Sequence, residues 1–147
     1  MNPDFLDMLR ALLEADVRFL IVGAYALNLY TKPRATGDLD IWVDATPENA
    51  PKVMTALRAF GAPLTDVNEA DFSQPSITFQ IGIPPARIDL LTHLTALEFD
   101  DAWQSRVRHK LGPYSVDFLG RESLIKNKRA IGRHKDLADI ESLEQGS

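Results

Sequence analysis

The chain has 147 residues, with 16 Lys and Arg against 21 Asp and Glu, so its formal net charge is −5. Its hydrophobic and charged fractions, 45% and 25%, are those of an ordinary globular protein. The absence of cysteine excludes a disulfide scaffold, a zinc ribbon, a thiol nucleophile and a cysteine-ligated iron–sulfur cluster. No signal-peptide pattern and no apolar run of membrane-spanning length is present in the sequence. We therefore expect one soluble, cytoplasmic domain over residues 1–147, with no membrane partner.

The charges are divided unevenly along the chain. Residues 103–135 hold nine basic and two acidic side chains, a net charge of +7, and the remainder carries −12. A solvated face would explain this asymmetry as well as a binding surface would. The acidic total alone therefore does not exclude a phosphate-bearing ligand.

Hydrophobic periodicity predicts an α+β fold with a mixed sheet and helices packed mainly on one face. Thr46 and Pro47 form a helix start, as N-cap and first helical residue, and Gly61 ends that helix. The core is expected over about 17–119, followed by closing helices over about 121–144. The elements expected in chain order are helix 4–14, strand 17–22, helix 24–30, strand 38–43, helix 47–60, strand 77–81, turn 82–86, strand 87–91, a hairpin of 106–111 and 114–119, and helices 121–131 and 135–143.

Three acidic residues on two predicted strands are candidate metal ligands. The alternation of D-L-D-I-W-V places Asp38, Asp40 and Trp42 on one strand face, with the two acidic Cα atoms roughly 6.5–7 Å apart. Asp89 lies in another short apolar strand, where a charged side chain is costly unless it faces water or a metal. Oxygen ligands without nearby His or Cys favour Mg²⁺ or Mn²⁺. The alternative is that these acids lie on the solvent-exposed face of a half-buried sheet.

Gly23 stands between a predicted buried strand and a helix start. There it can free backbone N–H groups and a helix N-terminus to face a phosphate, although a tight turn would need glycine as well. Neither G-x-G-x-x-G nor G-x-x-x-x-G-K-[ST] occurs, so a Rossmann dinucleotide site and a P-loop are unsupported.

Taken together, these motifs resemble the nucleotidyltransferase superfamily of the DNA polymerase β type. The resemblance rests on F-L-I-V-G-A-Y-A-L, then T-G-D-L-D-I-W-V, then R-I-D-L-L. The later segment N-K-R-A-I-G-R-H-K-D-L-A-D-I is similar to that of small prokaryotic members, including AbiEii-type toxins. The resemblance covers about residues 17–143.

This resemblance implies a nucleotidyltransferase-like domain that moves a nucleoside monophosphate from a nucleoside triphosphate to a hydroxyl of an RNA (such as tRNA), a protein or a small molecule. Asp38, Asp40 and Asp89 would be the catalytic residues and the ligands of two Mg²⁺ or Mn²⁺ ions. The chain could be a toxin with a cognate antitoxin as partner. The implied nucleotide-binding residues are Gly23, Ala24, Lys128, Arg133 and Lys135, of which Lys128 is expected to point away from the core; Lys32 and Arg34 are weaker candidates for the same role.

Three other interpretations stay open. Ala24 stands where many active relatives carry a serine, so the backbone contact with a triphosphate survives and the hydroxyl contact does not. The fold could therefore serve as a binding module, namely an antitoxin, an inhibitor or a nucleotide sensor. A haloacid-dehalogenase interpretation of Asp38 is weaker, because polar residues precede it, and a purely structural domain would make its acids incidental. Trp42 is expected to pack rather than to stack on a base, and Asp136 and Asp139 are expected to be helix-start and surface acids.

Overall fold

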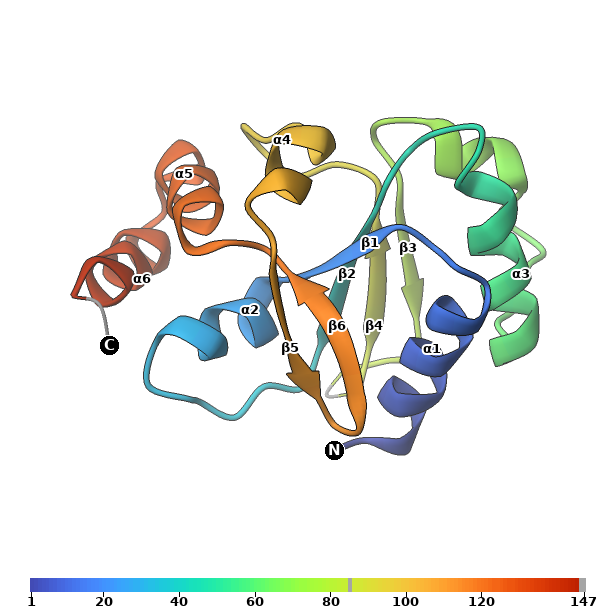
Figure 1. The fold of residues 1–147 in the computed structure, drawn as a ribbon, viewed down its shortest axis with the longest axis horizontal. Helices are drawn as coiled ribbons and strands as arrows, with labels where there is room; N and C mark the ends of the chain where they lie inside the picture. The colour runs from blue at the N-terminus through green and yellow to red at the C-terminus, as the bar shows by residue number, and fades with distance from the viewer. Residues whose placement is uncertain (85, 146–147) are drawn as a thin grey trace.

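The computed structural model describes residues 1–84 and 86–145 and confirms an α+β fold with a mixed six-stranded sheet (Figure 1). None of the helices in these ranges is long and apolar enough to cross a membrane. The predicted turn at 82–86 includes Pro85, which lies outside the described residues. The elements in chain order are α1 (Pro3–Glu14), β1 (Phe19–Val22), α2 (Gly23–Tyr30), β2 (Leu39–Val43), α3 (Ala50–Phe60), the 3₁₀ helix η1 (Glu69–Ser73), β3 (Thr78–Ile81), β4 (Ile88–Leu91), α4 (Phe99–Gln104), β5 (Val107–Leu111), β6 (Tyr114–Phe118), α5 (Arg121–Ile131) and α6 (His134–Glu144).

The order of the strands brings three distant segments to one edge of the sheet. The order is β3-β4-β2-β1-β6-β5, with β2 parallel to β4 and antiparallel to β1. The N-terminal ends of β2 and β4 therefore meet the C-terminal end of β1. In this register Asp40 is the partner of both Val22 and Asp89. Gly23, the residue after Val22, thus lies beside two of the three candidate acids.

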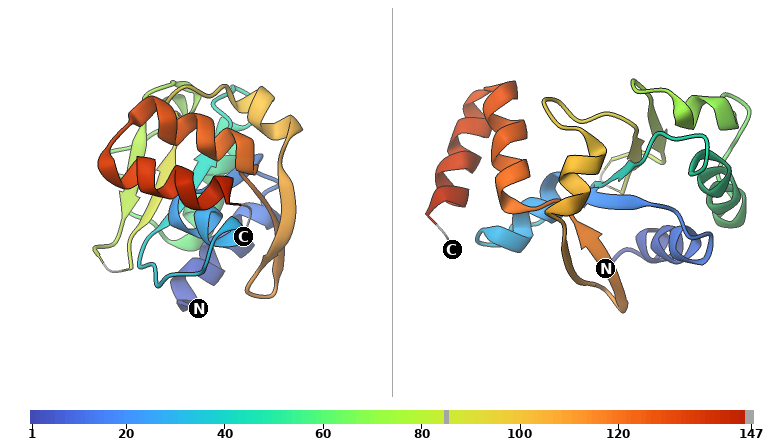
Figure 2. Two further views of the ribbon diagram at one scale, coloured as in Figure 1. Left: turned by 90° about the vertical axis from the view of Figure 1, so that its left-hand side faces the viewer. Right: turned by 45° about the horizontal axis from the view of Figure 1, so that its top comes forward.

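Helices cover both sides of the sheet. Figures 1 and 2 show α1 and α3 on one side and the α5–α6 pair on the other. The buried apolar side chains form one cluster that extends from Phe5 in α1 to Leu143 in α6. The expectation that helices pack mainly on one face is therefore too narrow, because the last two helices close over the opposite side. That side is the one that carries Asp40 and Asp89.

Two local details differ from the predicted elements. Helix α3 begins at Ala50, with Pro51 in its first turn, rather than at Pro47. Thr46 still acts as a cap, because its Oγ1 accepts a hydrogen bond from the Asn49 N–H at 3.1 Å, but it closes a preceding turn. The short elements η1 and α4 were not predicted. Phe99 of α4 packs edge-to-face on Trp42 at 5.0 Å between ring centroids.

Candidate functional site

The turn from β1 into α2 brings the backbone against a carboxylate. Gly23 has φ +67°, a conformation that L side chains rarely adopt, and α2 begins at this residue. A Cβ added to Gly23 would clash with Oδ2 of Asp40. Glycine is therefore required here for two reasons, its backbone conformation and the approach of Asp40. The sequence suggested the turn but not the second contact.

Asp40 and Asp89 lie side by side on β2 and β4. The parallel register pairs them directly, and their carboxyl groups are within hydrogen-bond reach of each other. Burial, the charge and hydrogen bond of Asp89, and the charge of Asp38 raise the pKa of Asp40 to about 6, whereas Arg87 lowers it. Asp89 itself is only 7% exposed. The structure thus brings two of the three predicted acids together, on the face where the alternation placed Asp40.

Asp38, Asp40 and Asp89 are called the acidic group below. Arg87 is the basic residue that contacts this group, and it was not among the predicted site residues. Its Nη2 lies 3.4 Å from Oδ2 of Asp38, and its Nε lies 2.9 Å from Oδ1 of Asp89. The second distance is that of an ion pair, but the N–H is not aligned for a hydrogen bond, so both buried atoms lack a hydrogen-bond partner. Its position two residues before Asp89, hence on the same strand face, was the available signal.

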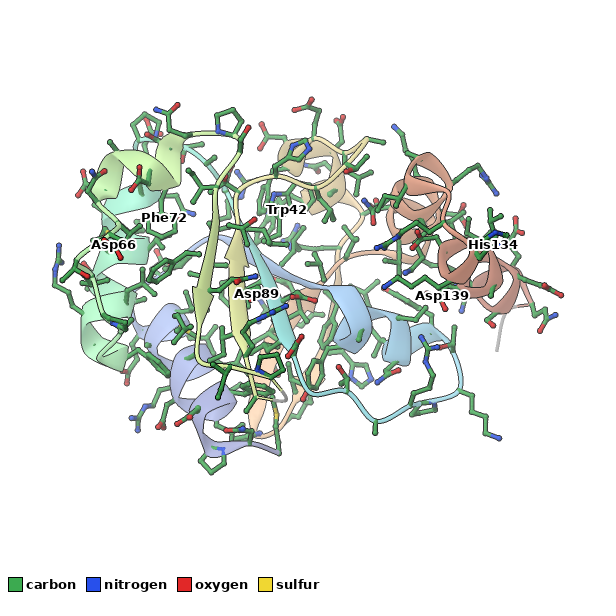
Figure 3. The ribbon with its side chains drawn as sticks, turned by 180° about the vertical axis from the view of Figure 1, so that it is seen from behind. Trp42, Asp66, Phe72, Asp89, His134 and Asp139 are labelled. Carbon is green, nitrogen blue, oxygen red and sulfur yellow. The ribbon has the colours of Figure 1, made fainter. Side chains whose placement is uncertain are left out.

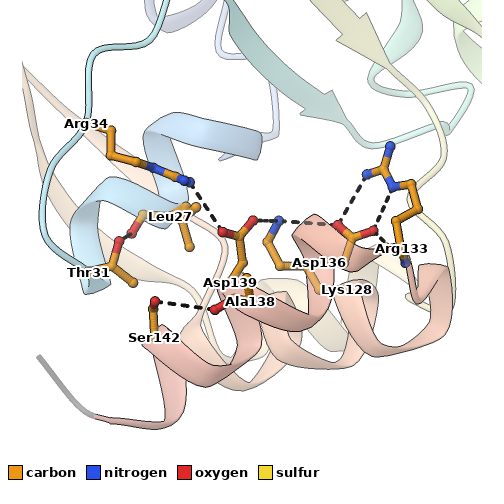
Figure 4. A network of polar contacts seen from close by, with 9 residues as sticks. All are labelled: Leu27, Thr31, Arg34, Lys128, Arg133, Asp136, Ala138, Asp139 and Ser142. Atoms are coloured by element: carbon orange, nitrogen blue, oxygen red, sulfur yellow. Dashed lines mark hydrogen bonds and ion pairs between the residues drawn. The ribbon is translucent and has the colours of Figure 1, made fainter.

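A chain of ion pairs joins Lys128 of α5 and Arg133, which precedes α6, to Arg34 in the loop after α2 (Figure 4). Lys128 lies 2.9 Å from Asp139 and 3.7 Å from Asp136, measured from Nζ to the nearest carboxylate oxygens. Arg133 donates hydrogen bonds from Nε and Nη2 to Asp136 at 2.6 and 3.2 Å, and these bonds lower the pKa of that carboxyl. Asp139 also pairs with Arg34 at 3.4 Å.

The two acids of α6 are therefore not the surface acids that were expected. Asp136 does lie at a helix start, where its Oδ2 accepts a hydrogen bond from the Arg133 backbone N–H, but it is fully buried. The side chain of Asp139 is 14% exposed, as is that of Lys128. Lys128 was expected to point out of the core, but it forms a mostly buried ion pair between two helices. These acids hold the cations in place around a cleft.

That cleft has a volume of about 680 Å³ and gathers most of the predicted site residues. Asp89 is not on its lining but lies beside Asp40 on the neighbouring strand; Figure 3 shows Asp89 on the sheet and Asp139 on α6. A smaller cavity of about 210 Å³ adjoins it at Gly23, Asp40 and Lys128. The predicted residues that line the cleft are Gly23, Ala24, Asp38, Asp40, Lys128, Arg133 and Lys135, and Arg34, Thr36 and Asp139 join them.

Two other predicted features lie outside this cleft. Lys32 is exposed in the loop after α2 and lines a separate hollow. Trp42 is 2% exposed and packs against Phe99 of α4, as expected.

A second cleft of about 380 Å³ lies where β1 begins, at the end of that strand remote from Gly23. Four basic side chains line it, and each of them forms an ion pair with an aspartate. None of the predicted site residues lines it, which makes it the weaker candidate for an anionic ligand. The pairs are Arg18 with Asp44 and Asp100, Lys52 with Asp16, and both Arg106 and Arg108 with Asp117.

The acidic group is not pre-arranged around a metal ion. Within residues 1–84 and 86–145, no three His, Cys, Asp or Glu side chains are grouped so as to hold one. Asp38 is turned to Arg87 instead, which leaves Asp40 and Asp89 as a pair. The donor chemistry nevertheless suits a hard cation, because Oδ1 of Asp89 is a buried oxygen without a hydrogen-bond partner. Asp40 has no ion-pair partner among the described residues.

Comparison with known proteins adds no family to this picture: no family model matches the chain, and no curated protein matches it either.

Proposed function

We propose that the protein is a metal-dependent nucleotidyltransferase that moves a nucleoside monophosphate from a nucleoside triphosphate to an acceptor hydroxyl. One observation carries the proposal. A single cleft brings together a glycine at a helix start, two carboxylates of the acidic group and four basic side chains, from segments more than 80 residues apart in the sequence. A nucleoside triphosphate needs both the basic side chains and the carboxylates, because its phosphates require cations and its α-phosphate requires a polarising metal ion, which carboxylates hold.

The acidic residues fit a divalent cation by their chemistry. Asp40 and Asp89 would hold it, and Asp38 would join them where its ion pair with Arg87 gives way. When bound, such ions polarise the α-phosphate and stabilise the attacking and leaving oxygens. The fit rests on the carboxylates of Asp40 and Asp89, which lie side by side, and on the buried Oδ1 of Asp89, which has no hydrogen-bond partner and only the charge of Arg87 beside it.

The basic residues would hold the leaving pyrophosphate. Arg133 and Arg34 keep 56% and 61% of their side chains exposed, so they can donate to a phosphate while still paired with Asp136 and Asp139. Lys135 adds an exposed ammonium group on the cleft wall. The acceptor oxygen attacks the α-phosphorus, the bond to the β-phosphate bridging oxygen breaks, and pyrophosphate leaves along these cations while the hydroxyl proton passes to water. The protein's own contribution is position and charge.

A second candidate function is a nucleotide-binding module without turnover. Ala24 offers a backbone N–H and no hydroxyl at the start of α2, and Arg87 already occupies part of the acidic group. Such a module could act as a nucleotide sensor, an inhibitor or an antitoxin. It predicts nucleotide binding without release of pyrophosphate.

Transfer of label separates the two functions. The protein is incubated with each α-³²P-labelled nucleoside triphosphate, Mg²⁺ or Mn²⁺, and total RNA (including tRNA) or protein from a prokaryotic lysate. We expect label on one acceptor class, lost in Asp40→Asn and kept in Asp66→Asn, which removes the same charge from an exposed loop. Binding of a nucleotide by calorimetry without labelling or pyrophosphate release would favour the module. Absence of both binding and transfer would overturn the proposed function.

A further inference from the structure

Arg87 is placed where a divalent cation would have to bind. It comes two residues before Asp89 and shares its strand face, so its guanidinium reaches back over the acidic group. It spans two candidate ligands, with Nη2 3.4 Å from Asp38 and Nε 2.9 Å from Asp89. A guanidinium offers both acids positive charge and N–H donors and has no acceptor atom of its own.

The negative charge of the acidic group requires a cation at the position of Arg87. Arg87 contacts Asp38 and Asp89, Asp40 lies beside Asp89, and among the described residues Arg87 is the only basic side chain that pairs with any of the three. Like charges this close, and partly removed from water, destabilise the folded protein unless a cation shares them. Arg87 supplies that cation in the protein alone.

The ion pair between Arg87 and Asp89 can be broken without the loss of a hydrogen bond. Arg87 Nε and Asp89 Oδ1 lie close together but are not aligned for a hydrogen bond, so charge holds them without the directional bond that strengthens most buried pairs. The Arg87 side chain is 28% exposed, which leaves it a path to solvent. By contrast, Arg133 binds Asp136 through two aligned hydrogen bonds.

We propose that Arg87 stands in for the divalent cation and competes with it for Asp38 and Asp89. Binding of the ion displaces the guanidinium toward solvent and frees both carboxylates to join Asp40. Arg87 is thus a positioning residue that keeps the acids together before the metal arrives. This inference rests on the proposed function, because it assumes that the acidic group takes a metal ion.

The test is the affinity for Mn²⁺ alone, measured by electron paramagnetic resonance of the free ion and by calorimetry, without nucleotide. Arg87→Met keeps most of the side-chain volume and removes the charge, so we expect Mn²⁺ to bind about tenfold more tightly than to the wild type. In EDTA the same variant should melt at a lower temperature than the wild type, and Mn²⁺ should raise its melting temperature by a larger amount. Arg87→Lys keeps the charge on a shorter side chain, so its Mn²⁺ affinity and its melting temperature in EDTA should lie between those of the wild type and Arg87→Met.

The matched control is Arg108→Met, which makes the same change at an arginine that also pairs with a buried aspartate, Asp117, outside the site. Its Mn²⁺ affinity should equal that of the wild type. A purely structural role for Arg87 predicts weaker metal binding in Arg87→Met, and equal or weaker binding overturns the inference while the proposed function stands. If Arg87→Met does not fold, Arg87→Lys decides by the same measure. If neither the wild type nor any Arg87 variant binds Mn²⁺, the inference and the proposed metal dependence both fail.

Discussion

Replacing Asp40 by asparagine is expected to stabilise the protein at neutral pH in the absence of divalent cations. Burial and the neighbouring charge of Asp89 raise the pKa of Asp40 from its ordinary 3.8 to about 6. Between these pH values the unfolded chain loses the Asp40 proton while the folded protein keeps it. The free energy of unfolding therefore falls as the pH rises through this interval, and the loss is complete above about pH 6.

The size of the effect follows from the same interval. Between 3.8 and about 6, at about 1.4 kcal/mol per pH unit, the ionised carboxylate costs about 3 kcal/mol. Asp40 lines the cleft, where water screens part of its charge, so we expect about 1–2 kcal/mol to be measured. Asparagine keeps the shape of the side chain and can donate an N–H to the unpartnered Oδ1 of Asp89.

The assay is urea unfolding followed by circular dichroism, in EDTA, at pH 8 and at pH 4. Asp40→Asn should be more stable than the wild type at pH 8 and nearly equal to it at pH 4. Asp66→Asn, which removes an exposed charge, should change stability by less than about 0.5 kcal/mol at either pH. No gain at pH 8, or an equal gain at both values, would refute the claim that Asp40 is held ionised at a cost to folding.

Two further substitutions test other parts of the site. Gly23→Ala should lower the free energy of unfolding by more than about 2 kcal/mol, because it adds strain at positive φ and a clash with Asp40. Gly61→Ala, at φ +90° with open space around its Cβ, should lose only about 1 kcal/mol in the same urea titration, and similar losses for the two would contradict the close approach. Lys128→Met leaves the two acids of α6 without their shared ammonium group, so it should cost about 2–3 kcal/mol and abolish nucleotide binding in calorimetry. Lys126→Met, on the exposed face of the same helix, should leave both quantities unchanged, and nucleotide binding by Lys128→Met would remove Lys128 from the site.

The strands and helices that form the candidate site were predictable because their signals are local. An apolar run that ends in glycine, a D-x-D alternation and a third acid in a short apolar strand each identify an element without knowledge of its neighbours. The residues at these positions, Gly23, Asp40 and Asp89, do lie together in the structure.

The pairing of charges was not predictable, because it depends on strand order and helix docking. Nothing local to Arg87 indicates that it reaches Asp38, which lies on another strand segment 49 residues earlier. Asp139 was expected at the surface, yet it joins Arg34 to Lys128 across three segments. Helix α4 was missed for a different reason, because its six residues are too few to show a helical hydrophobic periodicity.

The distribution of the site along the chain also sets the order in which it can form during synthesis. Gly23, Asp40 and Asp89 are all made before residue 90, whereas Lys128 follows 39 residues later, which is about 2–8 s at typical translation rates. Strand β6, which pairs in parallel with β1, is also made in this interval. The growing chain therefore contains Asp38, Asp40 and Asp89 for seconds before Lys128, Arg133 and Lys135 are made. Under the proposed function, complete nucleotide binding has to wait until α5 and α6 have been made.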